Sequence, residues 1–393
     1  MTGIREMELG RRPWCAMERP GGISRSLTYD AAGRLTLKSK LDMARADKSE
    51  RMVATDQRTR LLYFDTNIYS RVAELDAGAE MISALRAMRA RVIASHAVLC
   101  ECWNTVSPRK RNAIAESLVA LASDYCPPHS VLETEELRAE LRYHHPDWIA
   151  SARRTDQARW LIDEDLKQWR CVCTDPSWRP ANWQEFWQTV SRFHRRDLAA
   201  VRKLRSRYGR DGAPSVSGFD VAKNLRVDER LLSQEVRDVL AGLEIWEQHC
   251  RLAAFMNYEA GLRERRASHM DYATLLASNL GDAPPTPAEH LWFWVAEARI
   301  DEMPRNLLTN LTTYLQTAEK PGRGNAYDNL HLSSMLDCDL FVSSDHRLIE
   351  VAKEAQSYIS TRAEPVLLPP ETDDVVGAVQ SLIEGKGGLS VAC

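Results

Sequence analysis

The sequence lacks two features that would assign it at once to a broad class of protein. No stretch approaches the roughly 18 consecutive apolar residues of a membrane span, and residues 1–12 carry no apolar segment that would mark a targeting signal. Charge of one sign is also missing, since 52 basic side chains face 55 acidic ones and the net charge is −3. We therefore expect no membrane association, and a polyanion would have to be held by a local patch.

The cysteines exclude two further classes. There are nine, an odd number, and none stands at C-x-x-C spacing. The pairs Cys100/Cys102 and Cys171/Cys173 have no second pair or histidine at the spacing of a zinc finger, so buried thiols are the favoured interpretation. An odd count in a chain of 393 residues argues against a disulfide framework, and we expect a cytoplasmic protein.

What the sequence does contain is a strand and helix alternation that is interrupted in the middle. Four apolar runs read as buried strands, and segments with helical spacing lie between them. We expect an α/β fold with a central parallel sheet, a hairpin at residues 27–36 and a short strand at residues 130–133. The four main strands are expected at residues 61–64, 91–95, 340–343 and 365–368.

The region between the two α/β segments has long, charged, aromatic-rich helical patterns and no clear strand pattern. The simplest account is a sheet domain interrupted by a mostly α-helical insertion. The expected divisions are an N-terminal extension that we expect to be poorly ordered (1–57), the first half of the sheet domain (58–134), the insertion (135–319), the second half (320–385) and a C-terminal tail (386–393).

Acidic residues follow the predicted strands. Asp65 and Asp345 each stand where a strand ends and a helix should begin, and Glu101 lies on the helix after the second strand. Asp328 opens a further helix. In an open α/β sheet the ligand crevice lies outside the carboxyl ends of the strands, so these four carboxylates should converge there. Nearby polar residues that can hold them are Asn67 and Ser343.

Four carboxylates in one crevice would repel one another unless a cation neutralised them. Oxygen-only ligands favour Mg²⁺ or Mn²⁺, which hold phosphate oxygens and activate water for attack on a phosphodiester. His331 and His346 stand beside candidate acids, but this site needs no nitrogen ligand, and we leave both out. Asp339 precedes its strand, so we interpret it as a turn residue at the far edge of the sheet.

At these residues the chain resembles the PIN-domain family of compact α/β metal-dependent nucleases, which includes the toxins of bacterial toxin-antitoxin pairs. The matching segments are Tyr-Phe-Asp-Thr-Asn ending at Asn67, the acid Glu101, Asp-Asn-Leu-His from Asp328, and Phe-Val-Ser-Ser-Asp ending at Asp345. The likeness covers roughly residues 58–134 and 320–385. The order of the segments makes the combined signal more specific than any one of them.

The resemblance implies a PIN-like three-layer fold and cleavage of RNA with Mg²⁺ or Mn²⁺. It implies Asp65, Glu101, Asp328 and Asp345 as catalytic, metal-binding acids, supported by Asn67 and Ser343. Two features depart from the family pattern: serine at position 343, where threonine is common, and an insertion larger than the domain. The insertion leaves the choice of substrate open.

The insertion also carries the densest basic run of the chain, which is a candidate for gripping a phosphate backbone. A solvated helix face paired with nearby acids explains the same run equally well. The basic residues concerned are Arg192, Arg195, Arg196, Arg202, Lys203, Arg205 and Arg207.

We therefore expect a metal-dependent endoribonuclease, with a toxin or defence role as its setting, RNA as its substrate, and an inhibitory protein or a second copy of the chain as candidate partners. Two alternatives stay open. One is a catalytically idle PIN-like module in which the helical region binds other proteins. The other is a DNA-directed, structure-specific nuclease.

Overall fold

The structure, a computed structural model, describes residues 28–29, 35–36, 59–149, 156–185, 188, 199, 202–203, 206, 221–263, 285–318 and 325–384. The chain divides into two compact units, Met1–Gln57 and Arg58–Cys393. In the first unit, β1 (Thr28–Tyr29) and β2 (Leu35–Thr36) pair antiparallel, which confirms the predicted hairpin. The second unit contains the central sheet and the candidate site.

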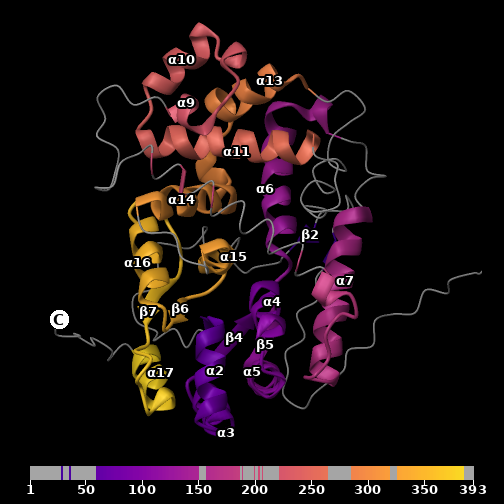
Figure 1. Cartoon of the computed structure of the whole chain (residues 1–393), viewed down its shortest axis with the longest axis vertical. Helices are drawn as coiled ribbons and strands as arrows, with labels where there is room; N and C mark the ends of the chain where they lie inside the picture. Colours follow the sequence, from indigo (N-terminus) through magenta and orange to yellow (C-terminus); the bar gives the residue numbers. More distant parts are fainter. Residues whose placement is uncertain are drawn as a thin grey trace, which may run out of the picture. The chain divides into compact units, whose positions relative to one another are not determined.

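A five-stranded parallel sheet forms the centre of this unit (Figure 1). The strand order is β5-β4-β3-β6-β7, so the first strand of the sheet lies in the middle and the chain runs outward from it in both directions. The four predicted strands are confirmed, and chain from both sides of the helical region completes one sheet. The strands are β3 (Arg60–Phe64), β4 (Ala90–Ala94), β5 (Ala122–Tyr125), β6 (Leu340–Ser343) and β7 (Glu364–Leu367).

The central strands are apolar on both faces because helices cover both sides of the sheet. Leu62, Tyr63 and Phe64 are all fully buried, and the Tyr63 ring stacks on that of Phe341 in the neighbouring strand at 5.4 Å between centroids. The helices connected with the sheet are α2 (Thr66–Glu74), α3 (Gly78–Ala87), α4 (His96–Asn104), α5 (Pro108–Leu121), α15 (Asn325–Ser333), α16 (His346–Ala355) and α17 (Val375–Ile383).

One expected strand is wrong. Residues 130–133 lie in helix α6 (His129–His144). The third strand of the parallel sheet, counted along the chain, is β5, which starts at the residue after the end of α5. The buried residues Val131, Thr134, Leu137 and Leu141 recur at three- and four-residue intervals, which is the spacing of one helix face. Four residues are too short a window to distinguish that spacing from a strand.

A second group of helices has its own hydrophobic core, which includes Leu252, Phe255 and Trp294. Figure 1 shows α9, α10, α11 and α13 together at one end of the unit, away from the strands. No helix in the described ranges is long and apolar enough to cross a membrane. The members of this group are α9 (Val221–Leu225), α10 (Gln234–Ala241), α11 (Ile245–Arg263) and α13 (Pro287–Trp292).

Helix α14 (Pro304–Ala318) joins the two regions. Its residues Leu307, Leu308 and Leu311 are buried in the same cluster as the sheet, although the sequence places them inside the expected insertion. Its first turn is held by α6, because Glu136 accepts hydrogen bonds from the backbone N–H of Arg305 at 2.9 Å and of Asn306 at 3.3 Å. The helical region therefore continues directly into the core of the α/β unit.

Helix α7 (Asp156–Thr174) docks on the sheet side of the molecule through a buried charge. Asp165 is 4% exposed, and its Oδ1 lies 2.5 Å from His96 Nδ1 and accepts a hydrogen bond from the Tyr125 hydroxyl at 3.0 Å. Trp169, one turn further on, stacks on the Tyr125 ring at 5.0 Å. Since His96 is the first residue of α4, this contact ties α7 to the helix that carries Glu101.

We predict that Asp165→Ala lowers the free energy of unfolding by about 3 kcal/mol, because it leaves His96 and the Tyr125 hydroxyl without their shared acceptor. Asp163→Ala removes an exposed carboxylate from the same helix and should change stability by less than about 0.5 kcal/mol. Urea unfolding followed by circular dichroism measures both values. Equal stability of the two variants would show that the buried contact contributes nothing.

Candidate metal centre

The site lies at the switch point of the sheet, where strands are added to one side of β3 by the earlier part of the chain and to the other side by the later part. β3 pairs with β4 on one side and with β6 on the other, and all three strands run parallel. In such sheets the carboxyl ends of the two strands at the switch point leave a crevice that takes the ligand. Asp65 directly follows β3, and Ser343 is the last residue of β6. The register brings them together, since the Asp65 N–H donates to the Val342 carbonyl at 3.0 Å.

Asp65 is a buried carboxylate, 4% exposed, that is held by several donors. Its Oδ1 accepts from the Thr66 N–H at 2.6 Å, and its Oδ2 accepts from Ser343 Oγ at 2.6 Å and from Asn67 Nδ2 at 2.9 Å. The structure thus places both supporting residues expected from the sequence against Asp65. Burial raises the pKa of Asp65, His331 opposes this, and the charge on Glu101 adds to it.

Glu101 reaches the same crevice from α4, the helix after β4. The Thr66 hydroxyl donates to its Oε2 at 2.5 Å, so Thr66 contacts both carboxylates, one with its backbone and one with its side chain. Burial would raise the pKa of Glu101, but His331 and the Thr66 hydroxyl outweigh burial and lower it. The partner that a charge in this apolar helix requires is therefore present.

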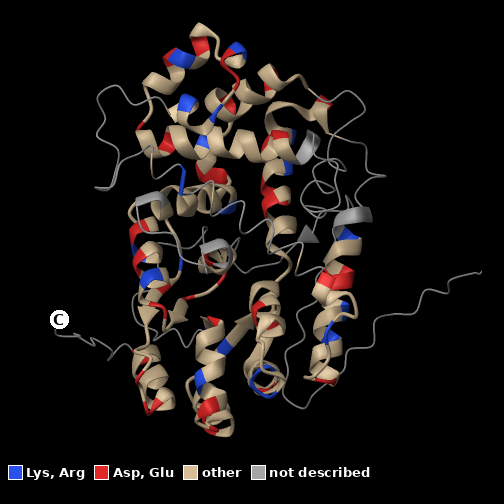
Figure 2. Cartoon of the chain, viewed as in Figure 1, with Lys and Arg blue, Asp and Glu red and all other residues tan. Residues whose placement is uncertain are grey.

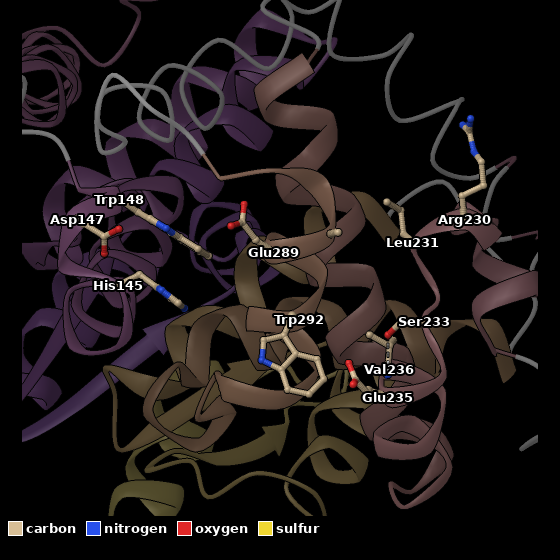
Figure 3. A pocket seen from close by; sticks show the side chains of 11 residues that line it. His145, Asp147, Trp148, Arg230, Leu231, Ser233, Glu235, Val236, Glu289 and Trp292 are labelled. Carbon is tan, nitrogen blue, oxygen red and sulfur yellow. Dashed lines mark hydrogen bonds between the residues drawn. The ribbon is translucent and has the colours of Figure 1, made fainter.

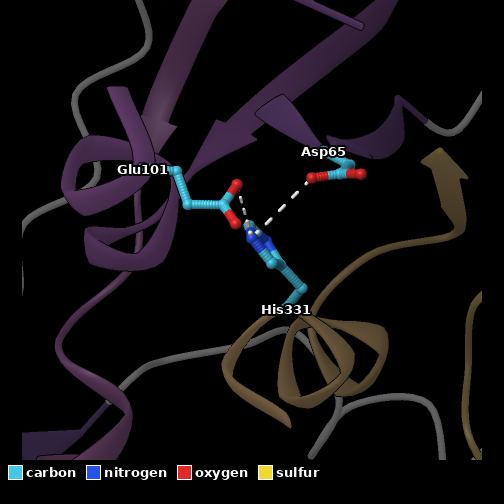
Figure 4. A group of neighbouring side chains, drawn as sticks. All are labelled: Asp65, Glu101 and His331. Carbon is cyan, nitrogen blue, oxygen red and sulfur yellow. Dashed lines mark ion pairs between the residues drawn. The ribbon is translucent and has the colours of Figure 1, made fainter. Parts of the chain in front are cut away.

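His331 is the residue that the sequence interpretation left out. It projects from α15 toward both carboxylates, with Nε2 3.1 Å from Glu101 Oε2 and 3.7 Å from Asp65 Oδ1 (Figure 4). On its other side, Nδ1 lies 2.7 Å from the Tyr63 hydroxyl, which is itself 2.9 Å from Ser95 Oγ. Burial opposes the imidazolium, but Glu101 and Asp65 raise the pKa of His331 to about 9.

Asp65, Glu101 and His331 each offer one donor atom, and the three atoms lie within 4.8 Å of one another. Two carboxylate oxygens and one imidazole nitrogen can hold a divalent cation. His331 stands three residues after Asp328 on one helix, so the two side chains share a face. This spacing was the signal that could have identified His331 from the sequence.

The other two expected acids do not belong to this group of three. Asp328 lies in the first turns of α15, where Gln316 Nε2 donates to its Oδ2 at 3.4 Å. Burial raises the pKa of Asp328 to about 7; His331 opposes this, while Asp345, Asp65 and Glu101 add to it. Asp345 is exposed and caps α16, accepting from the backbone N–H of Arg347 at 2.9 Å. Of the four expected acids, Asp65 and Glu101 therefore belong to the group of three, Asp328 lies close enough for their charges to act on it, and Asp345 is a helix cap.

The remaining candidates lie elsewhere. Asp339 precedes β6, where it accepts from the Leu61 N–H at 2.8 Å and pairs with Arg362, so it lies at the opposite end of the strands, as expected. His346 is exposed and pairs with Glu350 at 3.3 Å. Of the predicted basic run, only Arg202 and Lys203 fall within the described residues, and both are exposed. Figure 2 shows basic and acidic residues interspersed along α7 and α16, so neither helix forms a track of one charge.

A second hollow, of about 560 Å³, lies in the helical region (Figure 3). Its wall includes Trp148, on which His145 stacks at 3.7 Å. Three of its polar side chains have partners in the fold, because His145 pairs with Glu297, Arg230 with Asp228, and Glu289 with Thr286. None of the acids at the sheet lines this hollow, so the candidate functional site remains the group of residues around Asp65.

Comparisons of the chain with known protein families, with curated proteins and with solved structures gave no match. The functional conclusion therefore rests on the residues of the site.

We predict that Asp328→Asn stabilises the protein in EDTA. The pKa of Asp328 is raised in the folded state, so the stability linked to its proton is present below pH 4 and is lost as the pH rises toward about 7. Asparagine avoids this loss. Its advantage in unfolding free energy should grow from pH 4 to pH 7 and then level off at about 4 kcal/mol, because the pKa is raised from 3.8 to about 7. Urea unfolding at pH 4 and at pH 8 measures this advantage, and a variant less stable than wild type at pH 8 would contradict the prediction.

Proposed function

We propose that the chain is a PIN-like, metal-dependent endoribonuclease whose centre is formed by Asp65 and Glu101. The observation that carries the proposal is the convergence of these carboxylates and a buried imidazole at the switch point of a parallel sheet. A buried carboxylate is costly unless a cation or several donors compensate it. The same donor set suits a divalent cation, and the family resemblance connects such a site with RNA cleavage.

The residues around the centre have separable roles in the proposed reaction. Asp65 and Glu101 would bind a divalent ion, which when bound supplies charge neutralisation at the phosphate and lowers the pKa of water. Ser343 and Asn67 orient Asp65 through its Oδ2, which leaves Oδ1 facing His331. Thr66 fixes Glu101 relative to Asp65. The carboxylates are thus held in place before any ligand arrives, which is the preorganisation that catalysis requires.

Asp328 suits proton transfer. In the ion-free protein the pKa of this carboxyl group lies at about 7, and a cation bound to Asp65 and Glu101 would offset their charges and lower it toward the ordinary value. It lies close enough to Asp65 and Glu101 for their charges to raise its pKa. We assign it the exchange of a proton with the attacking water or the departing oxygen.

The test is cleavage of end-labelled single-stranded RNA and of matched DNA in Mn²⁺, in Mg²⁺ and in EDTA. We expect metal-dependent RNA cleavage that Asp65→Asn and Glu101→Gln each reduce by about 100-fold or more, because each removes a charge from the centre. Asp163→Asn, an exposed change on α7, should retain wild-type activity. Circular dichroism checks that each variant is folded.

The alternatives give different results in the same assay. Cleavage of DNA alone would favour the structure-specific DNA nuclease. Equal cleavage by wild type, Asp65→Asn and Glu101→Gln would indicate a contaminant, and the idle interaction module would then be the better account. Either outcome would overturn the proposed endoribonuclease.

A further inference from the structure

The Nε2 atom of His331 is buried and makes no hydrogen bond. The residue is 1% exposed, and Nε2 forms an ion pair with Glu101 Oε2 at 3.1 Å but has no hydrogen-bond partner among the described residues. Buried polar atoms without such a partner are rare in native proteins and call for an explanation, one of which is an absent ion. Here Nε2 points between two carboxylates, with which it forms ion pairs rather than hydrogen bonds (Figure 4).

The opposite side of the ring is held firmly. The Tyr63 hydroxyl lies 2.7 Å from Nδ1, and Tyr63 is fully buried in the central strand of the sheet. The Tyr63 hydroxyl can donate to Ser95 Oγ, 2.9 Å away, while it accepts from Nδ1–H. Histidines that bind metals commonly donate their other ring N–H in this way, which fixes the tautomer and directs the free nitrogen at the ion.

The distances around Nε2 fit a shared ion. Two ligand atoms at about 2.1 Å from one cation are about 3.0 Å apart at a right angle and about 3.4 Å apart in a tetrahedron. Nε2 lies 3.1 Å from the Glu101 oxygen and 3.7 Å from the Asp65 oxygen. A small movement of Asp65 Oδ1 toward the ring would bring it to ligand spacing from Nε2, and the three donor atoms already lie within 4.8 Å of one another.

We infer that His331 gives up its Nε2 proton to solvent when a cation binds, becomes a direct nitrogen ligand of the metal and makes the centre selective for a divalent transition-metal ion over Mg²⁺. Imidazole binds Mg²⁺ poorly and binds first-row transition ions with an affinity that rises from Mn²⁺, the weakest, toward Cu²⁺, whereas carboxylates accept both classes. This inference rests on the metal centre of the proposed function. It does not depend on which substrate is cleaved, and it replaces the oxygen-only ligand set expected from the sequence.

The experiment uses the full chain with Mn²⁺ as the probe. Calorimetry gives the dissociation constants for Mn²⁺ and Mg²⁺, and pulsed electron paramagnetic resonance detects the modulation that a ¹⁴N nucleus bound to Mn²⁺ produces. We expect Mn²⁺ to bind at least about 10-fold more tightly than Mg²⁺, with ¹⁴N modulation from one imidazole.

Three variants isolate the nitrogen. His331→Gln keeps a polar side chain but removes the imidazole, so it should abolish the ¹⁴N modulation and weaken Mn²⁺ binding about 10-fold while changing Mg²⁺ binding by less than about 3-fold. Tyr63→Phe should retain the modulation and weaken Mn²⁺ binding by about 10-fold through loss of the support to Nδ1. His346→Gln changes an exposed histidine on α16 and should alter neither measurement.

The outcomes separate this inference from the proposed function. Mn²⁺ binding without ¹⁴N modulation, or an equal loss of Mg²⁺ and Mn²⁺ binding in His331→Gln, would overturn the nitrogen ligand and leave the carboxylate centre standing. If wild type binds neither ion while remaining folded, both the inference and the proposed metal-dependent reaction fail.

Discussion

The constraint on which the rest of the site depends is the burial of the Asp65 carboxylate at the middle of a parallel sheet. A charge in that position has to be compensated. The fold supplies hydrogen-bond donors from the start of α2 and the end of β6, and an ion-pair partner, His331, from α15. Because these elements come from both ends of the unit, the site exists only when β6 has paired with β3. Assembly of the sheet and assembly of the site are one event.

The negative charge of the crevice is only partly compensated, and this would favour the binding of a cation. Burial raises the pKa of both Asp65 and Asp328, which means that it disfavours the ionised form of both carboxyl groups. His331 relieves part of that cost, yet its Nε2 atom lacks a hydrogen bond. Residues that lower the stability of a protein without its cation, and raise that stability once the cation binds, are typical of functional sites. The same carboxylates placed on a surface would be neutral in stability and would bind an ion weakly.

The helical region is coupled to this crevice through buried contacts. Asp165 of α7 holds His96 at the first residue of α4, and Glu101 follows on the same helix. Helix α14 places Gln316 against Asp328 and packs Leu308 and Leu311 into the sheet core. Two of the site's helices are therefore positioned by segments that lie outside the part of the chain with the PIN-like motifs. The region is part of the support of the site as well as a candidate surface for recognition.

The sequence by itself determined four of the five strands of the sheet, the parallel α/β arrangement and the end of the sheet at which the acids gather. It did so because buried strands are short apolar runs, because Asp65 directly follows one of them and because Ser343 ends another. It also led to Asp65 and Glu101 as neighbours. Local spacing could not separate the strand expected at residues 130–133 from the buried face of α6, since a four-residue window fits both periods.

Only the tertiary structure decided which of the remaining groups meet. Asp345 caps α16 with its carboxylate, while His331 points toward Asp65 and Glu101 with its other nitrogen held by Tyr63 of β3. The direction of a side chain depends on partners that lie far away in sequence, here 268 positions from Tyr63 to His331. A motif names the residues that can reach a crevice, and packing selects those that do.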